Sequence, residues 1–312
     1  MYDIIIVGGG PAGLTAAVYG LRAGKTVLVI EKNSFGGQIA FSPKVENIPG
    51  TVQISGAEFA DKLVEQAMNL GAEVELEKVV SVEKRDGVFF VSTEEGSTFE
   101  GRSVILALGV KHRMLGLPGE LELIGGGISF CAVCDGAFYT GQNVAMVGGG
   151  NSALQEALLL SEVCTKVTVV QNLADFTGEK KLAQALLAKE NVEVFFNHLA
   201  VGYVTENGTL TGLQIKDSVT GNEKTIAVEG VFLAVGLMPE NEPFGHLAYL
   251  NDWGYFDSQE DCRTATEGLF VAGDCRSKRI RQVVTASSDG AIAAMAAIAL
   301  SLCRPITTLI SI

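Results

Sequence analysis

The sequence predicts an α/β protein, because an apolar run, a glycine-rich loop and a helix follow one another twice along its 312 residues. The first loop, residues 8–13 (GGGPAG), follows the apolar run 4–7 and opens an alanine-rich helix. The second loop, residues 148–153 (GGGNSA), follows the run 144–147 in the same way. A glycine-rich turn between a strand and a helix is typical of dinucleotide-binding βαβ units. We therefore expect two Rossmann-like domains of the FAD- or NAD(P)-binding type.

The elements after each loop also repeat. After the first loop we expect the helix 12–23, the strand 26–30, the meander strands 79–83, 88–93 and 97–100, and the strand 103–107. After the second we expect the helix 152–163, the strand 166–170, the meander strands 199–205, 210–217 and 223–228, and the strand 231–234. Each half therefore predicts a three-layer domain with a β-meander.

A last segment belongs to neither repeat. It contains a short strand within 268–274 and a long apolar helix over about 281–302. The simplest topology returns this segment to the first domain, so the second domain is an insertion. We expect a first, FAD-binding domain from residues 1–114 and 244–312, and an inserted NAD(P)-binding-like domain from residues 115–243.

The net charge of −13 argues against binding to nucleic acid or to anionic membranes, because both attract basic surfaces. The longest apolar stretch, residues 291–303, falls short of the roughly 18 residues that span a bilayer. The N-terminus has no basic region ahead of an apolar one. We therefore expect a cytoplasmic protein.

The two units differ at the end of their second strands. Glu31 lies 18 residues after Gly13, where a carboxylate accepts the two ribose hydroxyls of an adenosine. Gln171 lies at the same offset from Ala153, and no arginine, lysine or histidine occurs within 167–179. NADH favours an acid at this position, and NADPH favours basic residues. The first unit therefore predicts a dinucleotide site, whereas the second lacks the charge that either pyridine nucleotide favours.

Cys131 and Cys134 form a Cys-x-x-Cys pair, which is either half of a zinc site or a redox pair. A zinc site normally needs two more ligands, but the three histidines are scattered and no second close cysteine pair exists. Asp135 follows directly and can move protons as thiol and thiolate alternate. We expect a redox disulfide with Cys131, Cys134 and Asp135 as catalytic residues and no metal.

Taken together, these motifs resemble the low-molecular-weight thioredoxin reductase family over nearly the whole chain. The matching segments are the first loop with Glu31, 36–38 (GGQ), 45–50 (VENIPG), 117–120 (LPGE), 131–136 (CAVCDG), 273–274 (GD) and 281–286 (RQVVTA). The resemblance implies FAD in the first domain, thioredoxin as the substrate and a homodimer. It also implies that Cys134 lies against the flavin, that Cys131 attacks the target disulfide, and that the inserted domain rotates between two arrangements.

The same resemblance implies the residues of the FAD site. Asp274 would bind the ribityl chain, and Gln282 would begin a helix whose N-terminus stabilises the negative charge of a reduced flavin. The expected cofactor-binding residues are Gly8, Gly10, Pro11, Ala12, Gly13, Glu31, Lys32, Gly37, Gln38, Asn47, Ala107, Gly109, Gly273, Asp274, Arg281, Gln282 and Val283.

The second loop resembles, more narrowly, that of the ferredoxin-dependent flavin thioredoxin reductases, which keep FAD and the dithiol but have no pyridine-nucleotide site. Asn151 and Gln155 also replace acids that NADPH-dependent relatives usually carry. This resemblance implies reduced ferredoxin as the electron donor in place of NADPH. The open alternatives are an NAD(P)H-dependent thioredoxin reductase with an atypical site, a thiol oxidoreductase with another donor, and a redox sensor.

An acidic enzyme needs a local basic surface to receive an acidic ferredoxin. Two basic clusters are candidates, residues 111–113 (Lys-His-Arg) and the group Arg276, Lys278, Arg279 and Arg281. A purely structural role for both clusters is the alternative.

Overall fold

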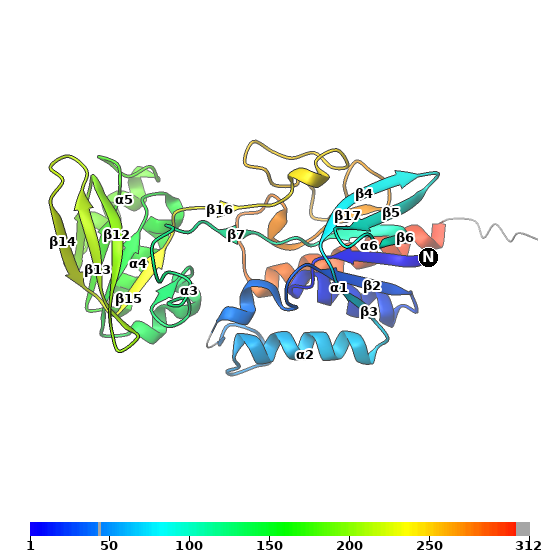
Figure 1. The fold of residues 1–312 in the computed structure, drawn as a ribbon, viewed down its shortest axis with the longest axis horizontal. Helices are drawn as coiled ribbons and strands as arrows, with labels where there is room; N and C mark the ends of the chain where they lie inside the picture. Colours follow the sequence, from blue (N-terminus) through cyan, green and yellow to red (C-terminus); the bar gives the residue numbers. More distant parts are fainter. Residues whose placement is uncertain (43–44, 304–312) are drawn as a thin grey trace, which may run out of the picture. The chain divides into compact units, whose positions relative to one another are not determined.

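The computed structural model describes residues 1–42 and 45–303 of the chain. The chain divides into two compact units. Unit 1 comprises Met1–Pro43, Ile48–Lys111 and Met238–Ile312, and unit 2 comprises Lys44–Asn47 and His112–Leu237. Each unit contains a parallel sheet with helices on one face and an antiparallel meander (Figure 1). The predicted α/β class is therefore confirmed.

Unit 1 is built on a seven-stranded sheet of order β3-β2-β1-β6-β5-β4, to which β17 adds by pairing with β6. Its elements are β1 (Tyr2–Val7), α1 (Pro11–Arg22), β2 (Val27–Glu31), η1 (Gly37–Phe41), α2 (Gly56–Asn69), β3 (Glu73–Leu76), β4 (Val79–Arg85), β5 (Val88–Thr93), β6 (Thr98–Leu106), η3 (Glu242–Phe244), β17 (Leu269–Val271), η4 (Gly273–Cys275) and α6 (Val283–Cys303).

The central strands of unit 1 are apolar on both faces, as a parallel sheet covered on both sides requires. Ile4 and Ile6 pack in one cluster with residues of α1 and α6. Ile5 and Val7 point the other way and pack with the meander residue Phe89. The two clusters give the three layers of the unit, with helices, parallel sheet and meander in that order.

One strand of unit 1 differs from the sequence prediction. The predicted strands 97–100 and 103–107 form the single strand β6, whose first part pairs antiparallel with β5 and whose second part pairs parallel with β1. Gly101 does not interrupt the strand, because it pairs with Phe89 on one side and with Tyr2 on the other. A Cβ at this glycine would lie 2.8 Å from the Ile5 side chain, so the bare backbone lets the strands come together.

Unit 2 repeats the parallel sheet, with five strands in the order β11-β10-β9-β15-β8. Its elements, with the border strands β7 and β16, are β7 (Lys111–His112), β8 (Ile128–Ser129), α3 (Ala132–Asp135), η2 (Gly136–Tyr139), β9 (Asn143–Val147), α4 (Asn151–Val163), β10 (Lys166–Val170), α5 (Lys180–Leu187), β11 (Val192–Phe195), β12 (His198–Glu206), β13 (Thr209–Asp217), β14 (Glu223–Ala227), β15 (Gly230–Leu233) and β16 (Leu237–Met238).

The meander of unit 2 is a separate sheet of order β12-β13-β14, unlike that of unit 1. Leu213 and Ile215 of β13 pack against Ala145 and Val231 of the parallel sheet. The opposite face of the parallel sheet packs against α4 and α5. The border strands β7 and β16 pair with each other in a two-stranded sheet.

Three α-helices were not among the predictions: α2, α5 and the single-turn α3. Helix α2 carries a signal at its start, because Ser55 accepts a hydrogen bond from the Glu58 amide at 3.1 Å, as an N-cap serine does. Helix α5 is short, and its N-cap residue Glu179 makes no side-chain capping bond. Its sequence therefore offered no comparable signal.

Helix α6 agrees closely with the long apolar helix expected over about 281–302, and it extends well beyond the run 291–303 considered from the sequence. The stretch Val283–Leu300 has a mean hydropathy of 1.6 and is long enough to cross a membrane by length and composition. One third of this stretch is buried, and its buried alanines join the core shared with α1. This packing is that of a helix belonging to the unit's own core.

The contact between α1 and α6 leads to a stability prediction. A Cβ at Gly290 would lie 2.0 Å from the Ala12 backbone oxygen. Helix propensity alone would make Gly290→Ala more stable by up to about 1 kcal/mol. We expect this variant instead to lose about 1–3 kcal/mol because of overpacking, measured by urea unfolding of the FAD-loaded protein. The exposed Ser288→Ala on the same helix is the control, and equal or higher stability of Gly290→Ala would contradict the close packing.

Candidate functional site

The first glycine-rich loop is held by contacts that leave no room for side chains. Gly8 has a φ of +109°, and a Cβ there would lie 2.3 Å from the Ala107 backbone oxygen. A Cβ at Gly13 would lie 1.9 Å from the Gly8 oxygen. Helix α1 then begins at Pro11 after the N-cap Gly10, with no side chain capping it. The free N–H groups of its first turn suit a bound phosphate.

Glu31 ties the loop to the end of β2. Its Oε2 accepts the Gly9 amide at 2.7 Å and its Oε1 accepts the Asn33 amide at 3.0 Å. Each carboxylate oxygen keeps a further lone pair for a ribose hydroxyl. Lys32, expected at the same site, directs its ammonium group to Glu240 instead.

The other predicted FAD residues gather at the carboxyl ends of the parallel strands of unit 1, except for Asn47. Gly36 donates its amide to the Gly9 oxygen at 2.8 Å, which brings Gly37 and Gln38 to the loop. Gln38 Nε2 donates to the Val110 oxygen at 3.0 Å, beyond the end of β6. Asn47 falls in the short segment grouped with unit 2. The predicted residues that unit 1 contains are Gly8, Gly10, Pro11, Ala12, Gly13, Glu31, Lys32, Gly37, Gln38, Ala107, Gly109, Gly273, Asp274, Arg281, Gln282 and Val283.

Asp274 tests whether unit 1 suits a flavin nucleotide. Its Oδ1 is buried and has no hydrogen-bond partner among the residues that the structure describes. Burial raises the pKa of Asp274, while Lys278 and Arg281 act to lower it. An unsatisfied buried carboxylate oxygen requires a donor. A ribityl hydroxyl would supply that donor, so the site fits FAD.

Asp289 of α6 holds the turn that carries Asp274. Its Oδ2 accepts the Gly273 amide at 3.0 Å and the Lys278 ammonium at 2.9 Å. Its Oδ1 accepts Arg276 Nη1 at 2.9 Å. The Arg276 and Lys278 side chains are only 9% and 12% exposed, so this is a buried ion network. Through the Gly273 amide, the network holds the turn that carries Asp274 in place.

The same network corrects the idea of two basic docking clusters. Arg276 and Lys278 are buried against Asp289, so they offer no charge to a partner. In the other cluster, Lys111 pairs with Glu240 at 2.7 Å. His112 stacks on Phe130, and burial lowers its pKa to about 4, so it is neutral at pH 7. Sequence spacing could not reveal these partners, because only the packing of the turn against α6 brings Asp289 to Arg276 and Lys278, and Glu240 comes from a distant segment.

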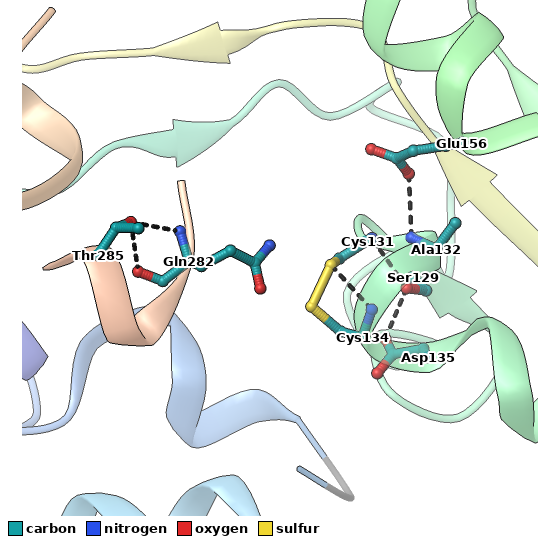
Figure 2. The surroundings of a disulfide bond; sticks show 8 residues. All are labelled: Ser129, Cys131, Ala132, Cys134, Asp135, Glu156, Gln282 and Thr285. Carbon is teal, nitrogen blue, oxygen red and sulfur yellow. Dashed lines mark hydrogen bonds between the residues drawn. A yellow bond between two sulfur atoms is a disulfide. The ribbon is translucent and has the colours of Figure 1, made fainter. Parts of the chain in front are cut away.

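Arg281 and Gln282 lead into helix α6. Arg281 stacks on the Tyr255 ring at 4.4 Å, and its Nε donates to the backbone oxygen of Asp274 at 3.4 Å. The Gln282 amide donates to Thr285 Oγ1 at 3.1 Å, as Figure 2 shows. Val283 is the first residue of the helix. The predicted helix start at about residue 281 is thus two residues early.

Cys131 and Cys134 form a disulfide in unit 2, with Cα atoms 5.3 Å apart. Cys131 precedes the single-turn helix α3, and its Sγ accepts the Cys134 amide at 3.1 Å. Asp135 Oδ2 accepts Ser129 Oγ at 2.6 Å (Figure 2). Burial raises the pKa of Asp135 above its ordinary value, against the effect of the Ser129 hydrogen bond. Burial thus favours the protonated form of this carboxyl group, which lies beside the disulfide and can donate or accept a proton.

Glu156 of α4 is a site residue that the sequence analysis missed. Its Oε2 accepts the Ala132 amide at 3.1 Å. Burial raises the pKa of Glu156 to about 7, and the charge of Asp135 contributes in the same direction. A signal was present, because Glu156 shares helical spacing with the buried residues Ala153 and Leu160. An acid on an apolar helix face requires a partner.

The second glycine-rich loop keeps the shape of the first. Gly148 has a φ of +135°, and a Cβ there would lie 2.5 Å from the Ala234 oxygen. The polar groups of this loop also bond to each other, as the Gly36 amide bonds to the Gly9 oxygen in unit 1. The amides of Thr177 and Gly178 donate to the Gly149 oxygen at 2.9 and 3.0 Å. The Glu179 amide donates to Asn151 Oδ1 at 2.7 Å.

Gln171 also turns inward at the end of β10. Gln171 is 3% exposed, and its Nε2 donates to the backbone oxygen of Asp175 at 3.0 Å. A Cβ at Gly149 would lie 2.3 Å from this Nε2. Gln171 therefore packs over the loop as Glu31 does in unit 1, but it brings an amide in place of a carboxylate. Over the described residues, no group of three or more His, Cys, Asp and Glu side chains could hold a metal ion.

Comparison with known proteins agrees with this arrangement. The family model described as "Pyridine nucleotide-disulphide oxidoreductase" matches residues 2–290. A thioredoxin reductase of Bacillus subtilis (strain 168) is 40% identical over 295 residues, covering 94% of this chain and 93% of the relative. One of Treponema pallidum (strain Nichols) is 40% identical over 297 residues, covering 95% and 96%.

Solved structures give the same result. The crystal structure of thioredoxin reductase from Streptococcus pyogenes MGAS5005 superposes with a TM-score of 0.92 at 35% identity. The match covers 97% of this chain and 99% of that one. Fold, disulfide and flavin-compatible site thus occur together with a match along nearly the whole sequence. The chain belongs to the thioredoxin reductases of the pyridine nucleotide-disulphide oxidoreductase family, and it is an FAD-binding flavoprotein.

Proposed function

We propose that the protein reduces thioredoxin through Cys131 and Cys134, with electrons that come from reduced ferredoxin through FAD. The names of its relatives support thioredoxin as the substrate. When bound, FAD supplies the redox chemistry that links a one-electron donor to a two-electron disulfide. The same family resemblance supports a homodimer, and we propose a cytoplasmic location.

The choice of ferredoxin as the electron donor rests on the burial and hydrogen bonding of Gln171. At the position where a nucleotide ribose would be recognised, the buried amide of Gln171 bonds to the Asp175 oxygen. A 2′-phosphate carries close to two negative charges and is recognised by arginine or lysine. The segment 167–179 contains neither. Unit 2 then serves as the carrier of the disulfide, with its second loop kept for structure.

Several residues of this chain have roles in the proposed reaction. Asp274 and the first loop hold the cofactor in unit 1. Asp135 lies beside the disulfide and holds a proton there. A thiolate forms as the S–S bond opens, and this proton can neutralise its negative charge. Cys131 and Cys134 accept the two electrons and pass them to the target disulfide by thiol exchange.

The redox energies allow a ferredoxin donor. A plant-type ferredoxin near about −400 mV and a thioredoxin near about −270 mV differ by roughly 130 mV. For two electrons this is on the order of 6 kcal/mol in favour of thioredoxin reduction. Among the proposed docking residues, Arg279 of unit 1 and Arg113 of unit 2 are exposed and make no ion pair with a residue that the structure describes, and each is a candidate contact for an acidic ferredoxin.

One observation favours an alternative donor. The N-cap glycines Gly10 and Gly150 have nearly the same backbone angles, with φ of −83° and −84° and ψ of −173° and −179°. The second loop therefore keeps a backbone that could receive a pyrophosphate. An NAD(P)H-dependent thioredoxin reductase with an atypical recognition site is the second candidate.

The donor proposal predicts which reductant bleaches the flavin. Under anaerobic conditions, reduced ferredoxin should bleach the visible absorbance of the FAD-loaded protein, and added oxidised thioredoxin should restore it. NADPH or NADH at micromolar concentration should leave the spectrum unchanged, because a neutral glutamine stands at the Glu31-equivalent position and no arginine, lysine or histidine lies within 167–179. Rapid bleaching by a pyridine nucleotide would reject the ferredoxin proposal and support the alternative.

A gain of nucleotide binding should follow from restoring charge to the end of β10. Asn172 and Leu173 are exposed, so Asn172→Arg with Leu173→Arg should fold normally. We expect NADPH to bind about tenfold tighter or more, since one charge-assisted hydrogen bond contributes about 1.5–3 kcal/mol. Isothermal titration calorimetry measures the change. Glu206→Lys alters net charge equally at the far end of β12, and an equal gain in that control would show a nonspecific effect.

A further inference from the structure

Glu156 lies outside the sequence motifs and has no part in the proposed reaction so far. It belongs to α4, the helix that follows the second glycine-rich loop, and it reaches the disulfide loop from there (Figure 2). Its Oε2 accepts the Ala132 amide at 3.1 Å. Helix α3, which carries Cys134, packs on α4. A carboxyl group from a different element therefore fixes the peptide next to Cys131.

The disulfide loop has two such carboxyl anchors in a row. The Cys131 amide donates to Ser129 Oγ at 3.1 Å, and Ser129 Oγ donates to Asp135 Oδ2 at 2.6 Å. The next amide, that of Ala132, donates to Glu156. The Cys131 amide is thus linked to Asp135 through the Ser129 hydroxyl, and the Ala132 amide is bonded directly to Glu156. Any change of charge on the sulfurs acts on both acids.

The two acids also act on each other. Burial is the main cause that raises the pKa of Glu156 to about 7, and the charge of Asp135 raises it further, whereas the Ala132 hydrogen bond lowers it. Tyr139 of η2 faces Asp135 and is itself neutral near pH 7, since burial raises its pKa. The elements β9, β10 and α5 pack against α4 with apolar side chains of the unit 2 core. Asp135 is therefore the charged neighbour of Glu156 within unit 2.

We propose that Glu156 is a positioning residue of the dithiol, which fixes the Cys131–Ala132 peptide and shares with Asp135 a proton taken up when the disulfide is reduced. Two electrons from a reduced flavin break the S–S bond and leave two negative charges on sulfur. One proton from the solvent neutralises the Cys131 or Cys134 thiolate, and a second proton from the solvent enters the Asp135–Glu156 pair while the other thiolate remains charged. On reoxidation by a target disulfide, the pair releases its proton. This inference rests on the proposed redox role of the dithiol.

The test is the pH dependence of the dithiol equilibrium in the FAD-loaded protein. The protein is equilibrated with dithiothreitol buffers from about pH 6 to about pH 9, and the cysteines are trapped with a maleimide and counted by mass spectrometry. Near and above pH 7, wild type should take up roughly one more proton per disulfide than Glu156→Gln, which means about a tenfold steeper change of the equilibrium constant per pH unit. The titration of dithiothreitol itself cancels between variants.

The variants separate charge from positioning. Glu156→Gln keeps an acceptor for the Ala132 amide and removes only the titrating group. Glu162→Gln removes an exposed carboxylate from the same helix and should titrate like wild type. Glu156→Ala removes the acceptor as well, and it should in addition weaken protection of the Ala132 amide from hydrogen exchange. Identical pH dependence of wild type and Glu156→Gln would overturn the proposal.

A second measurement needs no variant to fold. In the wild-type protein at about pH 8, above the Glu156 pKa of about 7, reduction of the disulfide should make the infrared carbonyl band of a newly protonated carboxyl group appear in the reduced-minus-oxidised spectrum. Absence of this band would also overturn the proposal. Neither measurement involves ferredoxin or thioredoxin. A protein that shows the extra proton but does not reduce thioredoxin would reject the proposed function and keep the role of Glu156.

Discussion

Both units depend on a close approach between two backbones at the carboxyl ends of β1 and β9. Gly8 and Gly148 each turn where a Cβ would lie within 2.5 Å of a neighbouring strand's carbonyl oxygen. The turn brings the helix that follows directly onto the sheet and directs its N-terminal amides to the strand ends. Every candidate site of unit 1, from Glu31 to Asp274, is arranged around that point.

Both units share this turn, but they differ in the residue at the end of β2 or directly after β10. Glu31 and Gln171 both pack over their loops, but a carboxylate can accept from amides and hydroxyls together, whereas the Gln171 amide is already bonded to the Asp175 oxygen. In both units amides close the loop by donating to the oxygen of its second glycine, Gly9 or Gly149. The acidic groups Asp135 and Glu156 of unit 2 lie at the disulfide, where electron transfer changes the charge.

Buried charge explains where sequence patterns misled. Arg276 and Lys278 look like a basic surface in the sequence, but both side chains are bonded to Asp289 of α6. Such a network is stable only because each charge is paired and hydrogen-bonded away from water. It leaves Gly273 and Asp274 in a fixed turn, with Asp274 Oδ1 ready for a hydroxyl donor.

Local patterns in the sequence were enough to predict the α/β class, the two loops, most strands and the Cys131–Cys134 pair, because turns, apolar alternation and short spacing act between neighbouring residues. Only the tertiary structure decided that residues 98–106 form one strand, since that depends on pairing with β1 and β5 at once. The helical spacing of Glu156 showed that it needed a partner, but the sequence could not show which partner that is. Its partner amide lies 24 residues earlier in the chain, and only the packing of α3 on α4 brings the two together.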